Sequence, residues 1–220
     1  MRKDIDAILA RLHVLVLGPG LGRETYIQQY ARTALVLARA RAMFVVLDAD
    51  ALWMIGQDVS LVKGYRRGVL TPNVVEFKRL CAQVGVGEDV QEGERAVEVS
   101  RRLGGVVVLE KGARDVVASD TTGEEADLDT SGIRVQEGDG EKVREVVEVD
   151  VEGGMKRCGG QGDVLSGCVG AMLAWGKCYE EGAFGCVCLR VFGVLLTGVV
   201  GIIVLQCRDC QSWLRSVEAS

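Results

Sequence analysis

The stretch RCGGQGDVLSGCVG, residues 157–170, decides the fold and the first functional prediction. Three of its glycines and Asp163 lead directly into a run whose apolar residues recur at helical spacing, namely Val164, Leu165, Cys168, Val169, Met172 and Leu173. Glycines let backbone approach a ligand, and the free amide N–H groups of a helix start favour negative charge. The stretch therefore predicts an anion site with a carboxylate beside it. The alternative is ordinary capping, because an aspartate in a first helical turn is favourable by itself.

Length and composition predict one α/β domain. The chain has 220 residues, of which 48% are hydrophobic and 26% charged, enough for one sizeable core. Only 5% are aromatic and two are proline, while valine is abundant, as in buried parallel strands. The single histidine, His13, excludes any mechanism that needs a pair of histidines.

Glycine-rich or polar motifs follow directly on four predicted strands. The apolar runs 14–17, 44–47, 68–70 and 106–109 lead into GPGLG (18–22), DADAL (48–52), TPNVVEFKRL (71–80) and KGARD (111–115). A helical pattern covers 26–40, and valine alternates with acid over 147–152, a half-exposed strand that delivers the chain to GGQGD. Ligands of open α/β sheets bind at the carboxyl ends of the strands, so these five loops outline one nucleotide-sized site.

Each motif also has a purely structural interpretation. The glycines at 18–22 could form a tight turn. The two carboxylates of DADAL, Asp48 and Asp50, could cap a helix instead of contacting a metal or ribose. Asn73 and Glu76 have the spacing of a capping box, or they could face a hydrated magnesium ion near phosphates. Lys111 could meet phosphate as a point charge. Their shared position favours a site.

The charge is unevenly distributed. Twelve acidic and three basic residues between 120 and 152 give this part −9, and the remaining 23 basic and 19 acidic residues give +4, for the net −5. A mildly basic body suits an anionic small molecule, but it lacks the clustered basic and aromatic residues of a nucleic-acid binder. Residues 119–142 have no period, which predicts an acidic mobile loop.

The cysteines and the chain ends indicate a reducing compartment. The eight cysteines form no two matched pairs of the CxxC type, which favours free thiols over zinc. The first thirteen residues are too charged for a secretory signal, so the cytoplasm is expected, with the mitochondrion as the alternative. Residues 191–207 are seventeen residues without a charge. We expect a buried apolar helix there rather than a membrane span, which usually needs about 20 residues.

The motifs GPGLGR, VLDADALW, LTPNVVEFKRL, EKGARD and RCGGQGDVLSG, in this order, resemble the ATP-dependent NAD(P)H-hydrate dehydratases of the ribokinase-like superfamily. The resemblance covers about residues 12–176. It implies a single ribokinase-like domain, a three-layer α/β sandwich with a mostly parallel central sheet. Only thirteen residues precede Val14, so we expect this sheet to be incomplete on its N-terminal side.

The resemblance also implies a reaction and a set of site residues. ATP would phosphorylate the hydroxyl of hydrated NADH or NADPH, and phosphate would then leave, with Asp163 as the catalytic base. ATP would bind at Lys111, Gly112, Ala113, Arg114, Asp115, Gly153, Gly154, Met155, Lys156, Arg157, Cys158, Gly159, Gly160, Gln161 and Gly162. The hydrated dinucleotide would meet Gly18, Gly20, Gly22, Asn73, Val74, Val75, Glu76, Phe77, Lys78, Arg79 and Asp163. Glu76 would support Mg²⁺.

Two other functions stay open from the sequence. The first is a small-molecule kinase of the same superfamily that phosphorylates a vitamin-precursor alcohol. The second is an inactive fragment that keeps nucleotide-binding loops. A homo-oligomer is also an open option.

Overall fold

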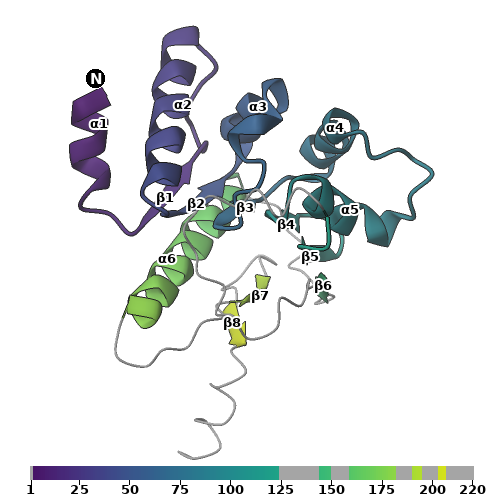
Figure 1. Cartoon of the computed structure of the whole chain (residues 1–220). Coiled ribbons are helices and arrows are strands. Elements are labelled where there is room, and N and C mark those ends of the chain that lie inside the picture. Colours follow the sequence, from purple (N-terminus) through teal and green to yellow (C-terminus); the bar gives the residue numbers. More distant parts are fainter. Residues whose placement is uncertain (1, 124–143, 150–158, 182–189, 195–202, 207–220) are drawn as a thin grey trace, which may run out of the picture.

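A computed structural model describes residues 2–123, 144–149, 159–181, 190–194 and 203–206 (Figure 1). Its main sheet has six strands in the order β1 (Val14–Leu17), β2 (Phe44–Leu47), β3 (Gly68–Leu70), β4 (Val107–Glu110), β5 (Asp115–Asp120) and β6 (Arg144–Val149). Neighbours from β1 to β4 pair in parallel, while β5 and β6 add antiparallel strands. The predicted α/β class with a mostly parallel sheet is confirmed.

Helices cover both faces of this sheet (Figure 1). One face carries α1 (Arg2–Leu9), α2 (Thr25–Ala40), α3 (Ala49–Gln57), α4 (Val74–Val84) and α5 (Arg95–Arg102), with the short 3-10 turns η1 (Val59–Leu61) and η2 (Glu92–Glu94). The other face carries α6 (Gln161–Glu181). Alternate residues of each strand therefore enter different cores, because successive strand side chains point to opposite faces.

The strand β2 illustrates this division. Val45 and Leu47 lie in the larger core under α1 to α5, whereas Val46 packs with Leu165 and Val169 of α6 in the smaller core. Gly170 allows α6 to lie close to the sheet, since a Cβ there would come within 2.6 Å of Val16 Cγ2. Only one face of α6 is buried, and Val164 and Trp175 are exposed.

The structure corrects several predicted boundaries. β4 begins one residue later than predicted, and β6 begins at Arg144 instead of residue 147. The acidic loop does not begin at Ser119, because Ser119 and Asp120 pair with β6 as the end of β5. Asp120 is buried, and its Oδ1 accepts hydrogen bonds from Thr122 N and Thr122 Oγ1. These hydrogen bonds compensate for the loss of contact with water. The rest of the predicted loop, residues 124–142, lies outside the described residues.

The apolar helix expected over 191–207 is wrong for the part of this stretch that the structure describes. The strands β7 (Arg190–Val194) and β8 (Ile203–Gln206) form an antiparallel two-stranded sheet. Valine and isoleucine are β-branched and favour strands. In a continuous apolar run, periodicity alone does not separate a buried strand from a buried helix. Among the described residues, no helix combines the length and the apolar character needed to cross a membrane.

Candidate functional site

The predicted loops meet at one edge of the sheet. Strands β1 to β4 run in parallel, so the segments that follow them, 18–22, 48–52, 71–80 and 111–115, leave the same edge. The start of α6 comes to this edge as well, because a Cβ on Gly162 would lie 3.4 Å from Lys111 Nζ. The prediction that these loops gather in one place is confirmed.

The carboxylate of Asp48 joins three of these segments. Asp48 follows β2 and is 2% exposed. Its Oδ1 accepts hydrogen bonds from Ala49 N at 2.9 Å, which caps α3, and from Lys111 Nζ at 2.9 Å. Its Oδ2 accepts a hydrogen bond from Ser166 Oγ of α6, and the same hydroxyl lies 2.9 Å from Gly162 O, so the two acceptors share its one proton. A partly buried ion pair thus fixes Lys111 under the first turn of α6.

The glycine loop after β1 is held against α3. Gly18 has φ +126°, and a Cβ at this position would lie 1.8 Å from the carbonyl oxygen of Asp48, so only glycine fits. Gly22 N donates to Asp50 Oδ2 at 3.0 Å, and Arg23 Nε donates to Asp50 Oδ1 at 2.8 Å. The Arg23 guanidinium lies 5.4 Å from the centre of the Trp53 ring.

Gln28 holds the same loop from the side of α2. Its side-chain Nε2 donates to the carbonyl oxygen of Gly22 at 2.6 Å, and the residue is 7% exposed. Asp50 binds the N–H of Gly22 and Gln28 binds its C=O, so both peptide groups of this glycine are fixed by side chains. These two hydrogen bonds restrict the backbone of the loop at Gly22.

The segment after β3 is a complete capping box. Asn73 Oδ1 accepts from Val75 N and Glu76 N, each at 3.0 Å, while Glu76 Oε2 accepts from Asn73 N at 2.9 Å. Lys111 N donates to Pro72 O at 2.8 Å, which brings this segment beside the KGARD loop. The structural interpretation of the Asn73 and Glu76 pair is thus supported, with Glu76 Oε2 engaged in the cap.

The predicted substrate segment 73–79 has two kinds of side chain. Val74 and Val75 are 59% and 60% exposed at the start of α4, and Lys78 and Arg79 are exposed too. Phe77 is 5% exposed and belongs to the larger core. The Phe77 ring therefore anchors the helix, and the other side chains remain accessible.

The two loops predicted to bind ATP differ in how much of them is described. In 111–115, Gly112 N donates to Asp115 Oδ1 at 2.9 Å, which closes a tight turn before β5. Burial raises the pKa of Asp115 above its ordinary value. Gly153, Gly154, Met155, Lys156, Arg157 and Cys158 lie outside the described residues. Gly159 and Gly160 are exposed, and a Cβ on either would meet no atom within 4 Å, so a ligand has room there.

Asp163 stands in the first turn of α6 and is exposed. The first helical hydrogen bond of this turn runs from Val164 N to Gly160 O at 3.0 Å. The amides of Gln161, Gly162 and Asp163 precede it and so have no carbonyl partner within the helix. This is the arrangement that stabilises an anion at a helix start.

A cavity of about 480 Å³ adjoins the site behind α4, and Glu110, Cys81 and Arg95 are among the residues that line it. Burial, with a smaller contribution from Glu92, raises the pKa of Glu110 to about 7. Burial also raises the pKa of the Cys81 thiol to about 11. Glu110 therefore holds its proton to a higher pH than an ordinary glutamate does, next to the loop that carries Lys111.

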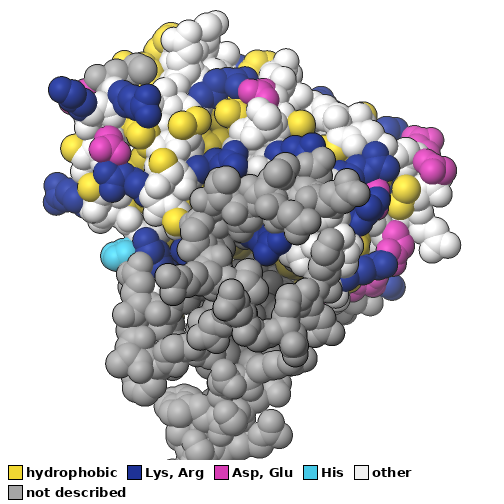
Figure 2. Space-filling view, viewed as in Figure 1, with side chains coloured by type: hydrophobic (Ala, Val, Ile, Leu, Met, Phe, Trp, Pro, Cys, Tyr) yellow, Lys and Arg dark blue, Asp and Glu magenta, His cyan; other side chains and the backbone are white. Residues whose placement is uncertain are grey.

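The described surface has no ready-made metal cage. No three His, Cys, Asp or Glu side chains come together within the described ranges. Figure 2 shows Lys and Arg side chains spread over the face seen there, with acidic side chains mainly at the end where α4 and α5 lie in Figure 1. The free thiols Cys81 and Cys168 agree with the prediction of unpaired cysteines for these two positions.

Sequence reasoning missed several residues that build the site. Ser166, Gln28 and Arg23 were not predicted as site residues. Asp50 was flagged within DADAL, but as a metal or ribose ligand rather than the partner of Gly22. The available signal for Ser166 was its position three residues after Asp163, one helical turn on, which places it near the same loops.

Comparisons with known proteins identify the family of this chain. A model of the family described as NAD(P)H-hydrate dehydratase matches residues 1–141 and 141–208. The ATP-dependent (S)-NAD(P)H-hydrate dehydratase of Mycosarcoma maydis is 39% identical over 181 residues, 82% of this chain and 45% of that protein. The protein of the same name from Bos taurus is 40% identical over 176 residues, 79% of this chain and 46% of that protein. The chain thus spans about half the length of the curated relatives it matches.

Solved structures show the fold. A ribokinase-like superfamily protein from Enterococcus faecalis has a TM-score of 0.57 at 19% identity, covering 78% of this chain and 51% of its own. A protein from Streptococcus mutans has the same TM-score at 15% identity, covering 79% of this chain and 53% of its own. With the family model matching nearly the whole chain and the loops GPGLG, DADAL, TPNVVEF and KGARD at one sheet edge, the chain belongs to the NAD(P)H-hydrate dehydratase family.

Proposed function

We propose that this chain carries out the ATP-dependent dehydration of hydrated NADH and NADPH within a single ribokinase-like domain. The observation that carries the proposal is the meeting of Lys111 with the start of α6, where Asp163 is exposed. Family membership and the names of the relatives support the substrate and the use of ATP.

Asp163 would be the base. It would take the proton of the hydroxyl on the hydrated nicotinamide ring as that oxygen attacks the γ-phosphorus of ATP, and ADP would leave. The ring nitrogen would then push its electron pair into the ring as the carbon–oxygen bond breaks and phosphate departs. Loss of a proton from the neighbouring ring carbon would complete the dehydration and restore the reduced nicotinamide ring. Phosphate is a far better leaving group than hydroxide. The amides of 160–162 would stabilise the charge on the transferring group.

The ATP phosphates would lie between Lys111 and the α6 start. Lys111 is fixed by Asp48 and is 20% exposed, so its ammonium group is partly accessible while its position is set. Residues 111–115 and 153–162 would form the ATP site, and Glu76 would face Mg²⁺. Magnesium keeps several waters and binds through one or two carboxylates plus phosphates, so a single carboxylate is compatible with it. Bound there, it would neutralise phosphate charge.

The hydrated dinucleotide would meet the glycine loop and the exposed side of α4. Gly18, Gly20 and Gly22 form a loop with bare backbone, and both peptide groups of Gly22 are fixed by Asp50 and Gln28. Asn73 and the exposed residues up to Arg79 would form the opposite wall. A fixed loop loses little conformational freedom on binding, which favours affinity.

The direct test is the recovery of the absorbance of the reduced nicotinamide ring from hydrated NADH, with ATP and magnesium present. We expect recovery with wild type and a loss of at least a hundredfold in kcat in Asp163→Asn, the scale of general-base catalysis. Asp89→Asn, which changes an exposed acid in the segment after α4, is the matched control and should keep full activity.

Two outcomes would reject the assignment. Folded wild-type protein that restores no absorbance would reject the dehydratase activity. Full activity in Asp163→Asn would reject Asp163 as the base. Release of inorganic phosphate, measured in the same reaction, separates a dehydratase from a kinase, because a kinase leaves its phosphate on the product.

A further inference from the structure

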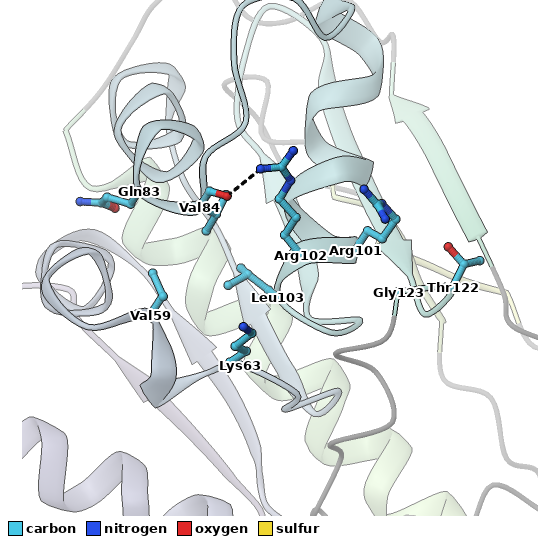
Figure 3. A pocket seen from close by; sticks show the side chains of 9 residues that line it. All are labelled: Val59, Lys63, Gln83, Val84, Arg101, Arg102, Leu103, Thr122 and Gly123. Atoms are coloured by element: carbon cyan, nitrogen blue, oxygen red, sulfur yellow. Dashed lines mark hydrogen bonds between the residues drawn. The ribbon is translucent and has the colours of Figure 1, made fainter.

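The second large hollow of the described molecule lies at the edge of the sheet opposite the candidate site. It is enclosed by segments that precede β3 and β4, by the ends of α4 and α5, and by the residues that follow β5 (Figure 3). Helices on parallel sheets run against the strands, so their ends and the strand starts share this edge. The hollow therefore shares no lining residue with the loops at the other edge.

Its lining is basic. Lys63, Arg101 and Arg102 contribute to it, and within the described residues no aspartate or glutamate does. Leu103, which is 1% exposed, and Val59 and Val84 supply apolar surface. The volume is about 690 Å³, within the range of roughly 300–1,000 Å³ that small-molecule sites have.

The two arginines are held in place from behind. Glu98 Oε2 accepts from Arg101 Nε at 2.7 Å, and Glu98 Oε1 accepts from Arg101 Nη2 at 2.6 Å and from Arg102 Nε at 2.7 Å. Arg102 Nη1 also donates to Val84 O at 3.1 Å, the bond drawn in Figure 3, and to Gly85 O at 2.6 Å. Such fixed guanidinium groups lose little freedom when they bind a further anion.

The two described acids that interact with these arginines do not line the hollow. Glu98 is 19% exposed, and hydrogen bonds from Arg101 and Arg102 lower its pKa to about 2. Asp120, which is 3% exposed, interacts electrostatically with Arg101. The charged side chains of the described lining are therefore all basic.

We propose that this hollow binds a small oxyanion that carries at least two negative charges, such as a phosphate ester or a dicarboxylate. Lys63 and Arg101 contact its charged groups, and Leu103 contacts its body. The site is separate from the candidate nucleotide site, yet α4 reaches both. Its first turn carries Asn73 to Glu76, and its last residue, Val84, lines the hollow. A bound anion therefore acts on the helix that forms one wall of the candidate substrate site.

The test uses inorganic pyrophosphate as the probe and the full chain. At 23.7 kDa the protein suits backbone amide NMR. We expect pyrophosphate to shift the amide signals of Lys63 and Leu103, and we expect affinity to fall about tenfold or more in Lys63→Gln and in Arg101→Gln, since each loses a charge-assisted contact. Lys3→Gln, which removes one exposed charge on α1, is the matched control and should bind like wild type.

The two pocket variants make the test independent of any single fold defect, and thermal melting of each shows that it is folded. The proposal fails if pyrophosphate shifts no amide signal, or shifts only signals near Lys111 and Gly160. It also fails if Lys3→Gln weakens binding as much as Lys63→Gln, which would indicate attraction to net charge alone.

Discussion

Asp48 is the residue on which both the fold and the candidate site depend. Asp48→Asn replaces a carboxylate that is 2% exposed and leaves the Lys111 ammonium group beside a neutral amide. Removing one partner of a fully buried ion pair costs about 3–5 kcal/mol, but the Lys111 side chain is 20% exposed, so water compensates part of the charge left behind. The bond from Ser166 Oγ is also weakened, since a neutral acceptor replaces a charged one. We therefore expect a loss of about 1–3 kcal/mol in the free energy of unfolding.

Denaturant unfolding measures this change, provided that the slope of the free energy against denaturant stays constant. Asp58→Asn is the matched control. Asp58 is also a helix N-cap paired with an arginine, Arg32, but its side chain is 42% exposed and the pair is 3.3 Å long. A surface pair contributes about 0–1 kcal/mol, so any larger loss in the control must come from its cap.

A double-mutant cycle completes the test. The double variant Asp48→Asn with Lys111→Met should lose less free energy of unfolding than the sum of the two single variants. The difference should be about 1–3 kcal/mol, because the charge left behind is removed together with its partner. Additive costs, or a loss below about 1 kcal/mol in Asp48→Asn, would refute the argument that this ion pair is a buried element of the fold.

Three further predictions concern the same edge of the sheet. Folded Glu110 keeps its proton up to about pH 7, whereas the unfolded side chain releases it near pH 4.5. The free energy of unfolding of wild type therefore falls as pH rises through this window. In denaturant unfolding, Glu110→Gln should be more stable than wild type by at most about 3 kcal/mol at pH 7, and no more stable below pH 4.5. Gly18→Ala places a Cβ 1.8 Å from a backbone oxygen and should cost about 3 kcal/mol or more, against about 1–2 kcal/mol for Gly20→Ala, whose Cβ meets no atom within 4 Å. Gln28→Met removes the donor to Gly22 O and should raise the KM for hydrated NADH about tenfold in steady-state kinetics while kcat changes less than twofold.

The strands that lead into the motifs could be predicted because their signal is local. Runs such as Val14 to Leu17 and Phe44 to Leu47 are continuous, apolar and bounded by glycine or aspartate, as buried parallel strands are. The motifs after them could be placed at one edge because parallel strands end together. The capping box at Asn73 was also readable, since its two hydrogen bonds join residues three apart.

The contacts between loops could not be predicted, because they join residues far apart in the chain. Asp48 and Lys111 are 63 positions apart, and Asp48 and Ser166 are 118 apart. No spacing rule links such pairs. The helix prediction for 191–207 failed for a different reason, because a continuous apolar run without charged residues has no period that separates a helix from a strand.

The position of β1 explains why the glycine loop needs side-chain support. Among the described strands β1 pairs only with β2, and Val16 is 37% exposed at this edge of the sheet. A strand with one neighbour holds the loop after it less firmly than a central strand does. Gly22 is instead fixed by Asp50 from α3 and by Gln28 from α2, while Gly18 lies against Asp48. The rigidity of this wall of the candidate site thus comes from side chains of α2 and α3. Substitutions of these side chains should lower substrate affinity without changing the pairing of the strands.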